Sequence, residues 1–294
     1  MTKVNDLIYD IGMNNGNDTA FYLACGYRVV AIEADPGLVA EASKRFKTEI
    51  GSNKLTILNV GVAEQAGTAE FWINEAHSHL NSFDRKTTAR NGEPHHFITI
   101  QCRRLDKIVC EYGVPYYMKI DIEGHDIVCC NQLLPNSKPN YLSVEMTRIE
   151  LLHKLRDLGY DRFKLITQVD HQAIGWRDAS PQVRALRSLH RLANYRRENR
   201  ALALRIARTG AAKVLQTASA LGIWGTKQFK SRILPEWNFG DGNSCSGSFG
   251  EDLSGKWLDG EEISHLWHYD SKEYRKMGQE FWCDLHACVT TENK

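Results

Sequence analysis

The chain has 294 residues, of which 42% are hydrophobic and 25% are charged, and its formal net charge is +1. These values are ordinary for a globular protein and exclude a disordered chain, a collagen-like repeat and a small disulfide scaffold. The length suggests one large domain, or one domain with a substantial appendage.

The first half of the chain alternates strand and helix patterns. Asp18 and Thr19 are residue types that begin helices, as is the pair Asp35-Pro36. We expect strands over 7–10, 28–33, 55–60, 69–73, 97–100, 116–121 and 141–145, with helices over 18–25 and from 35 onward. Strands separated by helices predict an α/β fold with a doubly wound, mostly parallel sheet.

The second half is less regular. A helix over 149–158 and a strand over 163–166 are expected first. Residues 181–234 then hold twelve Lys or Arg and one acid, for a net charge of +11, so the rest of the chain carries −10. We expect three parts: a core over 1–178, a basic helical insertion or lid over 179–234, and a C-terminal aromatic and acidic substrate cap over 235–294.

The chain ends and the cysteines indicate a compartment. The N-terminal residues lack a secretory-signal pattern, and no window is apolar enough to span a membrane. None of the eight cysteines lies in a C-x-x-C pair, so we expect no structural zinc and no metal site. Scattered thiols fit the reducing cytoplasm, and most should be buried as small apolar side chains.

A glycine-rich turn follows the first predicted strand. Asp10, Gly12, Asn14 and Gly16 form a D-x-G-x-x-x-G pattern ahead of a helix. Glycines there let backbone N–H groups approach a ligand, although a tight strand-to-helix turn would show the same residues. The acid inside the turn differs from the usual dinucleotide pattern and suits a ligand with both an amino group and a carboxylate.

Acidic residues end two further strands. Glu33 ends the second, where a carboxylate accepts hydrogen bonds from ribose hydroxyls of either a nicotinamide dinucleotide or S-adenosylmethionine. Strand alternation places Lys119, Asp121 and Glu123 on one side of a later strand end, close to His125. Such groups orient an acceptor hydroxyl or abstract its proton, or else form a salt-bridged strand end.

These residues, in this order, resemble the FkbM-type family of S-adenosylmethionine-dependent methyltransferases. The resemblance covers residues 8 to about 147, and the family's serine position matches either Ser78 or Ser82. The matching segments are Asp10 to Gly12 with Asn14, Gly16 and Thr19; residues 31–36; residues 61–63 with Gly67; Leu105-Asp106; and residues 119–124.

The resemblance implies a Rossmann-like class I methyltransferase fold and O-methylation of a hydroxyl on a sugar, glycan or secondary metabolite. Asp121 is the first candidate for the base, followed by Glu123, His125 and Lys119. The residues implied for S-adenosylmethionine are Asp10, Gly12, Asn14, Gly16, Thr19, Glu33, Gly61, Val62 and Asp121.

Acceptor-binding residues are expected at another strand end and in the C-terminal part. Aromatic faces beside carboxylates suit stacking on a sugar-like acceptor, although a subdomain core would show the same residues. The candidates are Glu145, Glu251, Asp252, Trp257 and His286.

The basic block over 181–234 leaves several interpretations open. It fits a solvated lid, a surface for an anionic acceptor, or a helix on the inner membrane surface. A nucleic-acid methyltransferase is an alternative function, but no helix-turn-helix or RNP-type signature accompanies the charge. The other alternative is a non-catalytic module that binds an anionic partner or a membrane.

Overall fold

The computed structural model describes residues 3–168, 171, 173–174, 229–230, 238–239, 245–276 and 281–290. Most of the basic block over 181–234 therefore lies outside the described residues. Its predicted helices and its role as a lid stay predictions. No helix in the described part of the chain is long and apolar enough to cross a membrane.

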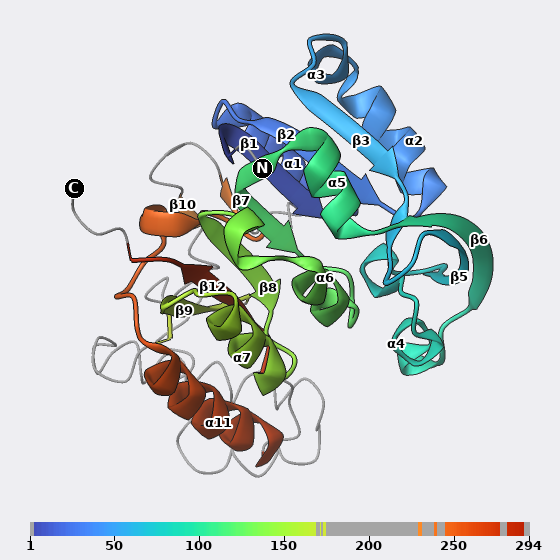
Figure 1. Ribbon diagram of the computed structural model, residues 1–294. Helices are drawn as coiled ribbons and strands as arrows, with labels where there is room; N and C mark the ends of the chain where they lie inside the picture. The colour runs from blue at the N-terminus through green and yellow to red at the C-terminus, as the bar shows by residue number, and fades with distance from the viewer. Residues whose placement is uncertain are drawn as a thin grey trace, which may run out of the picture.

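A mostly parallel seven-stranded sheet forms the centre of the fold (Figure 1). The strand order is β3-β2-β1-β7-β8-β12-β9, and β12 runs antiparallel to both of its neighbours. The strands are β1 (Lys3–Ile11), β2 (Arg28–Glu33), β3 (Leu55–Asn59), β7 (Val114–Ile120), β8 (Tyr141–Glu145), β9 (Arg162–Thr167) and β12 (Cys283–Cys288). The doubly wound, mostly parallel sheet predicted from the sequence is confirmed.

Helices cover both faces of this sheet. On β1, Tyr9 and Ile11 face one buried cluster while Ile8 faces the other, as strand alternation requires. Against the first face pack α5 (Leu105–Tyr112), α6 (Asp126–Gln132), α7 (Ile149–Asp157) and α11 (Gly260–Lys276). Against the second lie α1 (Asn17–Ala24) and α2 (Pro36–Arg45), with the short α3 (Lys47–Gly51) following α2.

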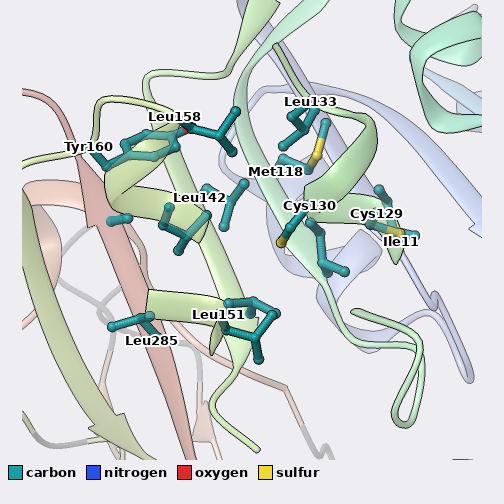
Figure 2. Close-up of a cluster of buried hydrophobic side chains, with 14 of the residues drawn as sticks. Ile11, Met118, Cys129, Cys130, Leu133, Leu142, Leu151, Leu158, Tyr160 and Leu285 are labelled. Atoms are coloured by element: carbon teal, nitrogen blue, oxygen red, sulfur yellow. The ribbon is translucent and has the colours of Figure 1, made fainter. Parts of the chain in front are cut away.

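Figure 2 shows the larger of the two clusters, where strand residues meet the helices on the first face. Met118 and Leu142 from β7 and β8 pack with Cys129 and Cys130 of α6 and Leu151 of α7. All eight cysteines are free thiols and six are buried. The expectation that most serve as small apolar side chains is confirmed.

A second, smaller sheet contains two of the predicted strands. The predicted strands over 69–73 and 97–100 do not join the main sheet but pair antiparallel with each other. The physical reason is a chain reversal between them, which makes local antiparallel pairing available. The elements of this region are β4 (Gly61–Val62), β5 (Gly67–Asn74), η1 (Ser78–Leu80), α4 (Arg85–Thr88), η2 (Arg90–Gly92) and β6 (His95–Arg103).

The C-terminal part of the chain contributes to the main sheet and its core, and its role as a substrate cap stays a prediction. Residues of β12 enter the main sheet between β8 and β9 rather than covering it from outside. Helix α11 packs its Ile263, Leu266 and Trp267 against the first-face core. The remaining short elements are η3 (Pro135–Ser137), β10 (Phe229–Lys230), β11 (Asn238–Phe239) and η4 (Gly250–Asp252).

Candidate functional site

The glycine turn and the end of β7 are in direct contact. The Asp121 N–H donates to the Ile11 carbonyl oxygen at 2.9 Å, which extends the β1–β7 pairing to the strand ends. Gly12 has a φ of +86°, and a Cβ at this position would lie 1.8 Å from the Asp121 carbonyl oxygen. Only glycine therefore fits between the two predicted motifs.

Glu33 holds the same turn from its other side. Its two carboxylate oxygens accept the N–H of Asn14 at 2.8 Å and the N–H of Asp35 at 2.9 Å. Burial raises the pKa of Glu33, partly opposed by these two donors. The Ser78 hydroxyl donates to the Asn14 side-chain oxygen at 2.8 Å. The end of β2 and the segment around η1 therefore both meet at Asn14.

Lys119 lies at the centre of three carboxylates. Its ammonium nitrogen is 2.9 Å from Asp18, 3.1 Å from Asp121 and 3.9 Å from Asp10. The Asp121 side chain is 41% exposed, whereas Lys119, Asp10 and Asp18 are buried. The Thr19 hydroxyl donates to one Asp10 oxygen at 2.6 Å, while the other Asp10 oxygen has no hydrogen-bond partner among the described residues.

Burial and the charges of neighbouring side chains together set the protonation of Asp10, Asp18 and Lys119. Burial raises the pKa of Asp10 to about 7 although Lys119 opposes it. Burial also opposes ionisation of Asp18, but Lys119 and the donors from Cys245 and Ser246 bring its pKa below the usual value. Desolvation disfavours the ammonium of Lys119, yet the surrounding carboxylates raise its pKa well above the usual value. Lys119 therefore favours the charged ammonium form, within ion-pair distance of three carboxylates.

The residues after Asp121 form a turn. Glu123 and Gly124 have φ values of +47° and +93°. The buried Asp126 carboxylate accepts the N–H of Ile122 and of Gly124, both at 3.2 Å, and the Ser82 hydroxyl donates to the Glu123 carbonyl oxygen at 2.8 Å. The predicted candidate Glu123 thus lies in a turn that directly follows Asp121.

His125 is the N-cap residue that precedes α6, and it packs against an aromatic ring. Its imidazole lies 4.8 Å from the Phe83 ring, centroid to centroid. Burial lowers its pKa. The histidine is therefore near the Asp121 turn and favours the neutral form.

Glu145 ends β8 beside the Asp121 turn. Burial, followed by the charges of Asp121 and Glu123, raises its pKa to about 9. Asp284 of β12 is paired with Glu145 in the sheet, and burial likewise raises its pKa well above the usual value. At neutral pH Glu145 therefore favours the protonated form, in which its carboxyl group can donate a hydrogen bond.

This raised pKa predicts a pH-dependent stability. Between its usual pKa near 4.5 and about 9, the folded protein holds a proton on Glu145 that the unfolded chain releases, so stability falls as pH rises. At pH 8, Glu145→Gln should raise the free energy of unfolding by about 1 kcal/mol or more, since one pKa unit corresponds to about 1.4 kcal/mol. Urea unfolding at pH 5 and 8 measures this, with exposed Glu150→Gln on α7 as control. Equal pH slopes for Glu145→Gln and the wild type would contradict the assignment.

Two predicted cofactor residues have a packing role. Gly61 pairs with Cys102 of β6, and an added Cβ would lie 2.6 Å from the Phe83 ring and 2.7 Å from Ile100. Val62 is buried in the first-face core. Their cofactor role remains a prediction.

The predicted acceptor residues do not all gather at one edge. Glu251 accepts hydrogen bonds from Tyr141, Arg162 and Trp257. Tyr141 and Arg162 begin β8 and β9, at the opposite edge from Asp121. The charge of Asp252 contributes to the raised pKa values of Cys25 and Tyr27, which precede β2 at that same edge. The structure therefore does not bring Glu251, Asp252 and Trp257 to Asp121.

His286 occupies the middle of β12. It pairs with Ser143 on one side and Lys164 on the other, and it is 2% exposed. Burial, with Lys164 and His171 nearby, lowers its pKa to about 3, so the imidazole is neutral. It shares a sheet face with Lys119 but is separated from it by β8.

Asp18 is the site residue that sequence reasoning assigned wrongly. It was expected to cap α1, but the cap position is Gly16, and the Asn15 side-chain oxygen, not Asp18, accepts the N–H of Asn17 at 3.0 Å. The carboxylate instead binds Lys119 together with Cys245 and Ser246. No spacing in the sequence connects residues so far apart. Asp35, by contrast, caps α2 through the Gly37 N–H as expected.

These contacts make the carboxyl edge of β1, β2, β7 and β8 the candidate site. Three acidic side chains converge there: Asp10, one oxygen of which accepts no hydrogen bond from the described residues, Glu33 behind the glycine turn, and the half-exposed Asp121. Within the described residues, no group of His, Cys, Asp and Glu side chains is arranged to hold a metal ion.

Three solved structures are similar to part of this chain. The FkbM methyltransferase of Methylobacillus flagellatus KT has 17% identity and a TM-score of 0.36, over 54% of this chain and 40% of that one. A precorrin-6y C5,15-methyltransferase of Geobacter metallireducens GS-15 has 14% identity and a TM-score of 0.28, over 59% and 72%. A precorrin-8W decarboxylase of Methanobacterium thermoautotrophicum has 16% identity and a TM-score of 0.30, over 58% and 75%.

The family comparison rests on the sequence. No curated protein matches the chain. The model of the methyltransferase FkbM domain, however, matches residues 10–162, which is just over half of the chain and contains both the glycine turn and the Asp121 turn. The chain therefore belongs to the FkbM methyltransferase family, on a Rossmann-like fold.

Proposed function

We propose that the protein transfers the methyl group of S-adenosylmethionine to a hydroxyl oxygen of a sugar, glycan or secondary metabolite. The observation that carries this proposal is the contact between Gly12 and the Asp121 carbonyl oxygen. It joins a ligand-binding turn to a half-exposed carboxylate, which is the arrangement that a transfer reaction between two bound molecules needs.

The turn residues fit the cofactor. One buried Asp10 oxygen accepts no hydrogen bond from the described residues and lies 3.9 Å from the Lys119 ammonium, so it retains acceptor capacity for an ammonium group of the cofactor. Glu33 retains lone pairs for hydroxyl donors beyond its two N–H contacts. When bound, S-adenosylmethionine supplies a methyl group already activated on a sulfonium. The protein then has to bind the acceptor, exclude water and take one proton.

Asp121 is the residue that we assign to this proton. Its carboxylate is exposed enough to reach an acceptor, and Lys119 orients it at 3.1 Å. The acceptor hydroxyl would donate to Asp121 and lose its proton there as the oxygen–methyl bond forms and the sulfur–methyl bond breaks, which leaves S-adenosylhomocysteine. Glu145, Glu123 and His125 surround the same turn and are the residues proposed to shape the acceptor site.

Calorimetry and thermal unfolding with S-adenosylhomocysteine test the cofactor. At 100 times its Kd, the ligand should stabilise the folded protein by about 2.7 kcal/mol. Absence of any stabilisation at millimolar ligand would overturn the methyl-donor proposal and favour a non-catalytic binding module.

Glu33→Ala should weaken S-adenosylhomocysteine binding by about 1–3 kcal/mol, because buried donors lose their acceptor. The exposed Glu41→Ala on α2 is the control and should bind as the wild type does. Titration calorimetry gives both affinities, and equal values would refute the ribose assignment.

The acceptor class needs a separate experiment. Incubation with methyl-labelled S-adenosylmethionine and hydroxylated glycans should give label that resists alkali, as a methyl ether does, whereas a methyl ester would release it. Label in RNA or DNA would favour the nucleic-acid alternative. The anionic-acceptor and membrane-surface proposals depend on 181–234 and stay predictions.

A further inference from the structure

Residues 245–249 lie far outside the family-matched range but pack against the glycine turn. Cys245 and Phe249 belong to the same buried cluster as Met13 of that turn. Phe249 stacks on Tyr117 with ring centroids 4.1 Å apart and meets Tyr22 of α1 edge-on at 5.9 Å. The segment is therefore anchored on the second face of the sheet.

The same segment delivers three donors to one carboxylate. The Cys245 thiol donates to one Asp18 oxygen at 3.0 Å, and the Ser246 N–H donates to that oxygen at 2.7 Å. The Ser246 hydroxyl donates to the other oxygen at 3.2 Å. Since Asp18 is buried, these donors replace the water that an ionised carboxylate would otherwise need.

Asp18 in turn connects to both halves of the site. It shares the Lys119 ammonium with Asp121, and it stands next to Thr19, whose hydroxyl holds Asp10 at 2.6 Å. The first turn of α1 is therefore held by Lys119 from β7 and by the C-terminal segment. Loss of the Lys119 ammonium, or of the donors at Cys245 and Ser246, would leave the Asp18 carboxylate without enough partners. The glycine turn that precedes Asp18 would then loosen.

We propose that Cys245 and Ser246 are positioning residues of the active site, which hold Asp18 and thereby keep the glycine turn in its cofactor-binding conformation. The inference rests on the proposed function, because it assigns the cofactor to this turn. A segment beyond the family domain thus completes the site in this chain.

Titration calorimetry with S-adenosylhomocysteine on the full chain, well below its unfolding temperature, tests the proposal. If loosening leaves roughly a tenth of the molecules with a competent turn, the apparent Kd rises about 10-fold. We expect this for Cys245→Ala combined with Ser246→Ala. Cys245→Ser combined with Ser246→Thr keeps a hydroxyl donor at both positions and should restore binding.

Ser248→Ala is the matched control within the segment. Ser248 is also buried, but its hydroxyl has no hydrogen-bond partner among the described residues, so its loss should leave the Kd unchanged. Hydrogen exchange gives a second readout. The amides of 12–18 should exchange faster in the ligand-free alanine double variant, and saturating S-adenosylhomocysteine should restore their protection.

The outcomes separate the two proposals. A wild type that does not bind S-adenosylhomocysteine would overturn the proposed function and this inference with it. A wild type that binds, together with a folded double variant whose Kd and exchange at 12–18 equal the wild-type values, would overturn this inference alone. If the double variant does not fold, Cys245→Ala and Ser246→Ala singly decide it by the same criteria.

Discussion

Gly12→Ala should destabilise the protein by about 3 kcal/mol and abolish S-adenosylhomocysteine binding. The added Cβ would lie 1.8 Å from the Asp121 carbonyl oxygen, and neither backbone can yield without breaking the pairing of β1 with β7. The left-handed φ of +86° adds a further cost for any residue with a Cβ. Urea unfolding and titration calorimetry measure the two effects.

Gly26→Ala separates the close contact from the backbone cost. Gly26 has a similar φ of +91°, but nothing lies within 4 Å of a Cβ built there. Its replacement should cost only about 1–2 kcal/mol and leave ligand binding intact. Equal losses of stability for the two variants would show that the contact with Asp121 is relieved by movement of the chain.

Lys119→Met should be the second severe substitution. It removes the cation that compensates Asp10, Asp18 and Asp121, two of which are fully buried. Breaking a buried ion pair by removing one partner costs about 3–5 kcal/mol, because a charge is left uncompensated. Lys107→Met, at an exposed position on α5, is the control and should change stability little.

The pH dependence of that loss identifies its cause. Without Lys119, the buried carboxylates should hold their protons to higher pH in the folded protein than in the unfolded chain. The stability gap between Lys119→Met and the wild type should therefore be larger at pH 8 than at pH 5. A gap that is the same at both pH values would indicate lost packing of the lysine stem rather than lost charge.

Local elements of the first half were predictable from the sequence. The β-branched run from Arg28 to Glu33 and the Asp35-Pro36 helix start appear as β2 and α2, because both depend on neighbouring residues. The sequence did not predict which strands pair with each other. Residues 69–73 and 97–100 were predicted as strands, but the sequence did not show that they form a separate sheet together with β4, since periodicity carries no information about pairing.

The C-terminal strand shows the same limit more clearly. Polar and apolar side chains alternate along 283–288, with Asp284 and His286 on one face and Leu285 on the other. The polar face suggested a substrate cap. In the sheet, however, that face meets Ser143 and Lys164 of the neighbouring strands, so all six residues are buried.

The sequence by itself determined the α/β class, the family and the two motifs at Asp10 and Asp121, because these depend on residues close together in the chain. Only the tertiary structure decided which charges meet. Lys119 compensates Asp18, and Asp18 is held by Cys245 and Ser246, more than 220 residues away in the sequence. Burial made these contacts decisive, since a carboxylate withdrawn from water needs donors from whichever segment packs against it.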